Sequence, residues 1–131
     1  MGVVFNDGTW NLARMQGFIR SALRSASMRW PPKYKVKSKA RVERGLYRCE
    51  GYNREAHVVP ASLPPKPGNK RRIDNVLVDH IVPVVCPNMG FVDWDSFIDR
   101  LFCDSSGLQV LCHECHLAKT ADEKIVRKNA I

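Results

Sequence analysis

The chain has 131 residues, enough for one domain with a modest core, and its hydrophobic fraction of 44% excludes wholesale disorder. The chain has no run of about 18 apolar residues, so no membrane span is predicted. The net charge of +8 comes entirely from residues 1–50, which hold 11 Lys and Arg against three acidic residues. A cationic arm beside a neutral body favours a polyanionic partner such as nucleic acid over a merely solubilising basic surface.

The first ten residues, MGVVFNDGTW, lack the charged and apolar regions of an export signal, so we expect a cytoplasmic protein. Five cysteines, an odd number, then favour metal binding over a disulfide framework.

Residues 9–29 are predicted to form a helix that Thr9 caps and Trp30-Pro31-Pro32 ends, because proline disfavours helix at the residue before it. Its apolar residues recur at three- and four-residue steps along one stripe. Arg20 and Arg24 lie one turn apart on a side that adjoins this stripe, and both are candidate contacts to DNA.

The segment that follows alternates lysines with other residues: Lys33, Lys35, Lys37 and Lys39. In an extended chain this alternation places four ammonium groups on one side. Two interpretations remain open, an edge strand protected by lysines and an arm lying along a phosphate backbone. Residues 1–44 are thus predicted to be a basic helix and arm, with Lys33, Lys35 and Lys37 as candidate DNA contacts.

Residues 45–131 are predicted to form a single compact α+β domain. A short strand enters a turn at LYRCEGY, residues 60–74 form a loop with a Lys70-Arg71-Arg72 cluster, and residues 75–85 form a β-branched strand. An inserted helix at 94–102 places Trp94, Phe97, Ile98 and Leu101 in the core. A short strand at 108–112 and a helix from 113 to about 127 complete the order strand, helix, strand, helix.

The densest chemistry lies in Cys112-His113-Glu114-Cys115-His116. Cys112 and Cys115 are spaced to bind one zinc ion, and Cys49 is a third thiolate. The first candidate for the fourth ligand is His57, followed by Cys86 or Cys103 and then by a water molecule. Cys-x-x-Cys also serves redox chemistry, and Cys-x-x-Cys-His attaches c-type haem, although the latter goes with export.

Two motifs together resemble the HNH endonuclease family of ββα-metal finger nucleases. They are Asp79-His80-Ile81-Val82-Pro83 and the run LQVLCHECHLAKT at 108–120, against family patterns DHIxP and NLQxLCxxCHxxKT. The resemblance covers roughly residues 45–125 and implies a zinc-stabilised β-hairpin and helix around one divalent cation. It implies that Asp79 and His116 bind a catalytic Mg²⁺ or Mn²⁺, that His80 is the general base, and that Cys49, Cys112 and Cys115 hold a structural Zn²⁺.

The basic N-terminal helix, the YRC turn and the CxxCH ending also resemble HNH proteins of tailed phages. This narrower likeness implies, by analogy only, the host cytoplasm as location and packaging proteins such as a terminase as partners.

The chain departs from the family pattern at two positions. Gly107 stands where the family has an asparagine that braces the loop and the base, a role for which Ser105 or Ser106 is a candidate substitute. Tyr52 stands where the second cysteine of a first Cys-x-x-Cys is expected, so the fourth zinc ligand is open.

The sequence therefore predicts a metal-dependent DNA endonuclease that hydrolyses phosphodiester bonds, with a non-catalytic zinc module that binds nucleic acid as the alternative. An imidazole with a pKa of about 6.5 can accept the proton of water at neutral pH. Asp79 and His80 are adjacent in a strand, so the hypothesis needs a bulge or bend there. Lys119, one turn after His116, is expected to neutralise a flanking phosphate. Sequence preference and oligomeric state are not indicated.

Overall fold

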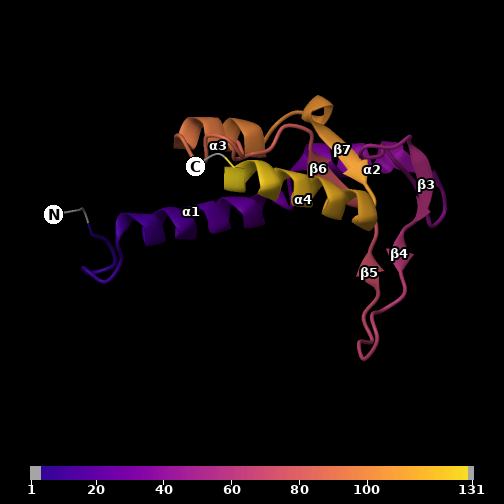
Figure 1. Cartoon of the computed structure of the whole chain (residues 1–131), viewed down its shortest axis with the longest axis horizontal. Coiled ribbons are helices and arrows are strands. Elements are labelled where there is room, and N and C mark those ends of the chain that lie inside the picture. Colours follow the sequence, from indigo (N-terminus) through magenta and orange to yellow (C-terminus); the bar gives the residue numbers. More distant parts are fainter. Residues whose placement is uncertain (1–3, 130–131) are drawn as a thin grey trace. The chain divides into compact units, whose positions relative to one another are not determined.

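The computed structural model describes residues 4–129, which form two compact units that meet in sequence between Trp30 and Pro31. The first contains one helix, and the second contains the remaining elements of the described chain (Figure 1). Among residues 4–129, no helix has both the length and the apolar character needed to cross a bilayer.

The first unit is organised around helix α1, Leu12–Ser27. Its N-cap is Asn11, whose side-chain oxygen accepts a hydrogen bond from the amide of Arg14 at 2.9 Å. Thr9 is therefore not the cap that was predicted, because its hydroxyl instead donates to the carbonyl of Asn6 at 2.7 Å in the preceding turn. The predicted Arg20 and Arg24 both lie on α1.

The second unit begins with helix α2, Pro31–Ala40, where an extended segment was predicted. Proline is tolerated in the first turn of a helix, since amides there have no partner within the helix, so Pro31 and Pro32 start α2 rather than only ending α1. Successive residues of a helix turn by about 100°, so the alternating lysines fall on different faces and not on one side.

Helix α2 packs against β7 and against β2 and β6 of the second unit. Residues 31–44 therefore belong with the domain that was predicted to start at residue 45, and the boundary lies 14 residues earlier than expected.

Two small antiparallel sheets follow. The first has the order β1-β2-β3, made of Arg41–Glu43, Leu46–Cys49 and His57–Pro60, with Cys49 opposite His57. The second pairs β4, Ser62–Leu63, with β5, Ile73–Asp74, so the predicted loop is in fact a short hairpin that extends away from the rest of its unit (Figure 1).

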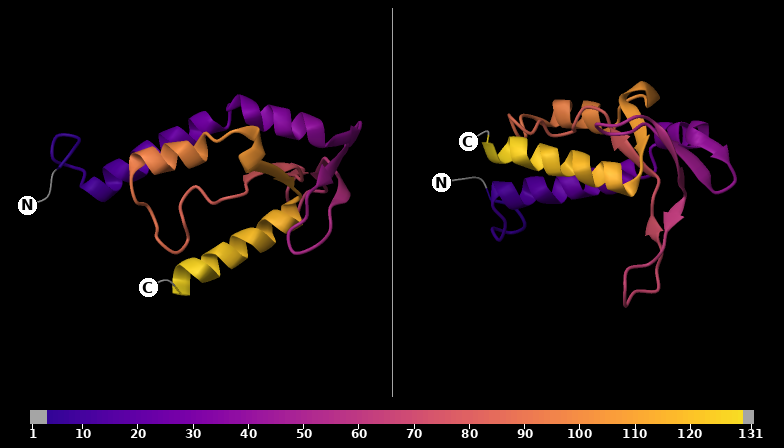
Figure 2. Two further views of the ribbon diagram at one scale, coloured as in Figure 1. Left: turned by 90° about the horizontal axis from the view of Figure 1, so that it is seen from above. Right: turned by 45° about the vertical axis from the view of Figure 1, so that its right-hand side comes forward.

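The last sheet pairs β6, Leu77–His80, with β7, Leu108–Leu111, and helix α4, His113–Asn129, follows directly. Helix α3, Trp94–Leu101, and the 3₁₀ turn η1, Ser105–Gly107, are inserted between the two strands. The predicted α+β class is confirmed. Helices α2 and α4 lie on opposite sides of the β6–β7 hairpin (Figure 2, left).

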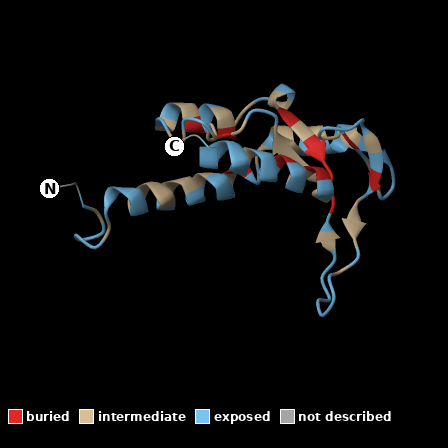
Figure 3. Cartoon of the chain, in the orientation of Figure 1, coloured by how far each residue is buried: buried red, intermediate tan, exposed pale blue. Residues whose placement is uncertain are grey.

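Burial concentrates on β7, whose Leu108, Val110 and Leu111 are all in the core (Figure 3). From α3, Phe97 and Leu101 are buried as predicted. Ile98 is 40% exposed and Trp94 is only partly buried, because an eight-residue helix with one covered side buries only its i and i+4 positions.

Candidate functional site

Three cysteines and one histidine converge where β2, β3, β7 and α4 meet. The ligand atoms of Cys49, His57, Cys112 and Cys115 all lie within 4.8 Å of one another. Cys49 and His57 are cross-strand neighbours, while Cys112 follows β7 and Cys115 lies in the first turn of α4. Three thiols and one imidazole at this spacing are a donor set that is compatible with a structural zinc ion.

The tautomer of His57 suits this role. Its Nδ1 lies 3.0 Å from the carbonyl oxygen of Glu55, and because a carbonyl can only accept, Nδ1 carries the proton. The neutral ring then has its lone pair on Nε2, which lies 3.6 Å from Cys112 Sγ. A protein carbonyl on the far nitrogen is the usual way to orient a metal-binding histidine. His57, the first candidate for the fourth zinc ligand in the sequence analysis, is thus the residue that the structure brings to the three cysteines.

The backbone also shapes the cluster around Cys49, whose sulfur accepts hydrogen bonds from the amides of Cys112 at 3.2 Å and Gly51 at 3.3 Å. Burial raises the pKa of Cys49 to about 11, although both amides oppose this. Burial also acts to raise the pKa of Cys112, but the hydrogen bond from the Cys115 amide, together with the contacts of the sulfur with the His57 ring and the Cys115 and Cys49 side chains, outweighs it and the pKa is lowered.

Gly51 makes the tight turn that follows Cys49. Its φ is +84°, and a Cβ at this position would lie 2.3 Å from the carbonyl oxygen of Arg54. Only glycine fits such a turn. A glycine two residues after Cys49 is visible in the sequence and indicates a turn there, but it does not identify His57 as the ligand that follows the turn.

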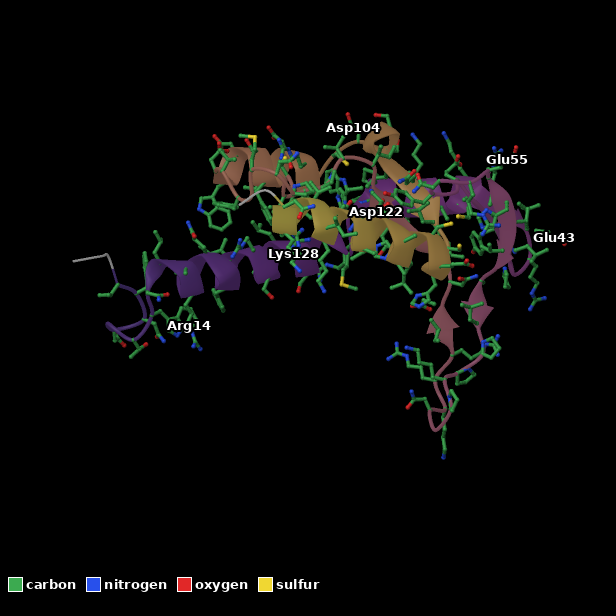
Figure 4. All side chains as sticks on the ribbon, viewed as in Figure 1. Arg14, Glu43, Glu55, Asp104, Asp122 and Lys128 are labelled. Atoms are coloured by element: carbon green, nitrogen blue, oxygen red, sulfur yellow. The ribbon has the colours of Figure 1, made fainter. Side chains whose placement is uncertain are left out.

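Tyr52, at the position expected for a second cysteine, has a packing role. Its ring packs against the buried cluster core, and its hydroxyl donates to Asp122 Oδ2 at 2.7 Å. Asp122 lies on α4 (Figure 4), so this bond ties the turn after β2 to that helix. The hydrogen bond to Asp122 raises the pKa of Tyr52. His57, in place of a fourth cysteine, completes the donor set.

A second pair of potential ligands lies nearby, where β6 meets α4. Asp79 Oδ1 is 3.8 Å from His116 Nε2. Two ligands of one Mg²⁺ at about 2.1 Å each lie roughly 3 to 4 Å apart, so this separation suits a shared cation. The Asp79 side chain is only 14% exposed and the His116 side chain is 38% exposed, so the pair opens to solvent on the histidine side.

His80 turns toward the end of α3. Its Nε2 lies 2.9 Å from the carbonyl oxygen of Leu101, so Nε2 must donate and the lone pair of the neutral ring is on Nδ1. The pairing of β6 with β7 is regular through Asp79 and His80, so no bulge forms there; instead β6 ends at His80 and the chain bends at Ile81 and Val82. Strand alternation therefore directs the two side chains to different elements, Asp79 to α4 and His80 to α3.

Lys119 lies differently from its predicted position beside a phosphate. The residue is 7% exposed, and its ammonium group donates to Asp79 Oδ2 and to the carbonyl of His80. A weaker contact of 3.4 Å reaches the carbonyl of Ile81. These protein oxygens take up its donors. The cause is helical spacing, since Lys119 lies one turn after His116 on the side of α4 that faces β6.

The structure explains the glycine at position 107. A Cβ there would lie 3.0 Å from Cys103 Sγ, so an asparagine would have to displace that sulfur. The backbone braces the loop instead, because the Ile81 amide donates to the Gly107 carbonyl at 3.0 Å. His80 itself donates from Nε2 to the Leu101 carbonyl at 2.9 Å.

The remaining predicted DNA contacts lie on helices. Lys35 and Lys37 are exposed on α2, and Lys33 is half-buried. The ammonium group of Lys37 lies 5.9 Å from the centre of the Tyr47 ring. Cys86 and Cys103, the other candidates for the fourth zinc ligand, are not members of the Cys49–His57–Cys112–Cys115 cluster.

Comparison of the chain with protein-family models, with curated proteins and with solved structures finds no match.

Proposed function

We propose that this chain is a metal-dependent DNA endonuclease of the HNH type. The observation that carries the proposal is the pair Asp79 and His116. Asp79 Oδ1 lies 3.8 Å from His116 Nε2, where β6 and its partner β7 meet α4. One carboxylate and one imidazole leave coordination positions open for water and phosphate, as a catalytic Mg²⁺ or Mn²⁺ requires. When bound, such an ion supplies Lewis acidity toward the scissile phosphate and the leaving oxygen.

The residues of the chain supply the proton transfer and the orientation. His80 accepts the proton of the attacking water on Nδ1 while the Leu101 carbonyl holds its Nε2–H. The water oxygen bonds to phosphorus, and the bond from phosphorus to the leaving oxygen breaks. Gln109 donates to Asp79 Oδ2 at 3.2 Å, which keeps Oδ1 on the side of His116.

The cysteine cluster has a separate and structural role in this proposal. Cys115 and His116 are consecutive on α4, so a zinc ion held by the cluster fixes the helix that also carries the cation ligand. Three thiolates and a histidine make a closed tetrahedral site with no position for substrate.

The test is cleavage of supercoiled plasmid in Mg²⁺ or Mn²⁺, with a reaction lacking divalent cations as control. We expect His80→Ala to abolish nicking while DNA binding persists, and His113→Ala to nick as the wild type does. Equal nicking by wild type and His80→Ala would exclude His80 as the base.

A second candidate function is a zinc module that binds nucleic acid without cutting it. Gly107 favours this reading, because the side chain that braces the base in the family is missing and Cys103 fills its space. Binding of DNA with no cleavage in either metal ion would support the module and reject the nuclease.

A further inference from the structure

A groove runs along β7 on the side of α2, inside the second unit. It encloses about 570 Å³. Helix α2 contributes Val36, Lys39 and Ala40, β2 and the residue after it contribute Arg48 and Glu50, and the remainder comes from Ile81, η1 and β7. We call it the α2–β7 groove.

One residue of the groove also contacts the candidate cation site. Gln109 lines the groove and donates to Asp79 Oδ2 at 3.2 Å. Ile81, another lining residue, directly follows His80, and Leu108 is the register partner of His80. Gln109 therefore connects the groove, on the α2 side of the hairpin, with Asp79, whose side chain faces α4.

The lining is charged on one side. Lys39 and Arg48 are exposed, and both belong to residues 33–48, which contain seven Lys and Arg and one acidic residue. Ser105, Ser106 and Gln109 add uncharged hydrogen-bonding groups. Glu50 is the opposing charge. Cations flanked by neutral polar groups suit a sugar–phosphate backbone, whose contacts position DNA without reading its sequence.

We propose that the α2–β7 groove binds the phosphate backbone of DNA on the α2 side of the β6–β7 hairpin, with Lys39 and Arg48 as phosphate ligands. The inference rests on the proposed function in taking DNA as the ligand. It adds Arg48, it adds Lys39 of the alternating lysines to the candidate DNA contacts, and it gives helix α2 a part in holding substrate.

The experiment measures binding of a short fluorescent DNA duplex to zinc-loaded protein, without other divalent cations, over a range of salt concentrations. The test variants are Lys39→Ala/Arg48→Ala and Glu50→Gln. The matched control is Lys124→Ala/Lys128→Ala, which removes the same charge from exposed positions on α4. Thermal melting by circular dichroism verifies that each variant is folded.

We expect the plot of log affinity against log salt to become shallower by about 2 in Lys39→Ala/Arg48→Ala, because each phosphate contact contributes a slope of about 0.9. Glu50→Gln should bind more tightly than wild type, since it removes a charge that repels phosphate. The control should keep the wild-type slope.

An unchanged slope in Lys39→Ala/Arg48→Ala, or an equal loss in the control, would overturn the inference and leave the groove to another kind of ligand, such as an extended peptide. Plasmid cleavage by the same proteins separates the two proposals. A nuclease with unaltered slopes refutes only the groove, whereas an altered slope in a protein that never cuts refutes only the nuclease.

Discussion

Lys119 connects helix α4 to the end of strand β6. Its ammonium group neutralises Asp79 and holds the carbonyl of His80, so one side chain fixes the residue proposed to bind the cation and the backbone of the residue proposed to act as base. The buried ammonium group and its oxygen acceptors stabilise the fold together. Removing the ammonium group would leave the buried Asp79 carboxylate without its neighbouring positive charge, which is unfavourable.

We therefore expect Lys119→Met to lower the free energy of unfolding by about 1.5–3 kcal/mol, the range for hydrogen bonds to charged groups. Urea denaturation measures the change, with Lys124→Met as the control on the exposed side of the same helix. If both variants unfold at the same urea concentration, the contacts of Lys119 contribute nothing to stability.

Gly107 and Cys103 should show energetic coupling. Gly107→Asn introduces the asparagine of the HNH pattern that the sequence resembles, but this side chain meets Cys103 Sγ, so we expect the substitution to cost about 1–3 kcal/mol, as overpacking does. Cys103→Ala removes that sulfur, so the double variant should lose less stability than the two single variants added together. Strict additivity in denaturation experiments would show that the sulfur is not the obstacle.

At the scale of residues, the sequence predicted the members of the Cys49–His57–Cys112–Cys115 cluster and of the Asp79–His116 pair that the structure brings together, but not how they are held. Cys-x-x-Cys spacing places two thiolates together through local geometry alone, whereas the position of His57 depends on its pairing with Cys49 across two strands. The burial of Lys119 also depends on tertiary contacts. Its spacing from His116 fits both a surface phosphate contact and the inward contact that the structure has.

Helix α2 illustrates why an element was predicted wrongly. Its lysines repeat every two residues, which suits a strand, while Val36 and Ala40 are four residues apart and lie on its half-buried side. Both periods are present in ten residues, and packing against β7 decides between them. By contrast, α3 was predicted because its apolar residues form a consistent helical stripe, and the helix predicted from residue 113 to about 127 corresponds to α4.

The turn at Gly51 offers a test at the level of elements. Gly51→Ala combines a strained positive φ with overlap against the Arg54 carbonyl, whereas Gly45→Ala has a φ of +80° and nothing within 4 Å. Strain alone costs on the order of 1 kcal/mol, so Gly45→Ala should melt slightly earlier than wild type. Gly51→Ala should lose more stability and also bind zinc more weakly, as measured by melting and metal content. Equal effects would mean that crowding at Gly51 is relieved without cost.

For the whole molecule, the distribution of buried residues links stability to the cysteine cluster. The core around the cluster consists of Cys49, Val59, Leu111, Cys112 and Cys115, so candidate zinc ligands form much of it. A structural zinc site in small zinc peptides contributes on the order of 10 kcal/mol, whereas native domains are stable by about 5–15 kcal/mol in total. Loss of a zinc ion from this cluster would thus be comparable to the entire stability of the domain.

Chelation should therefore unfold the second unit. We expect a strong zinc chelator to abolish the cooperative melting transition and to remove one zinc ion per chain, as measured by a colorimetric assay. We expect the Cys112→Ser substitution to abolish the transition as well, with a lower zinc content than wild type. Cys86→Ser is the control, since Cys86 is not a member of the cluster. A Cys112→Ser protein with full zinc content and an unchanged transition would refute the site.

Cys115 and His116 are consecutive, so one peptide unit separates two centres of opposite chemical hardness. Thiolates select soft zinc, while a carboxylate and an imidazole also accept magnesium or manganese. Zinc stands above manganese in intrinsic affinity for such nitrogen and oxygen donors, so hardness protects the thiolate centre from magnesium but does not protect the other centre from zinc. The proposed enzyme would consequently require zinc to fold and yet be inhibited when free zinc is abundant, which makes the cellular supply of metals a determinant of its activity.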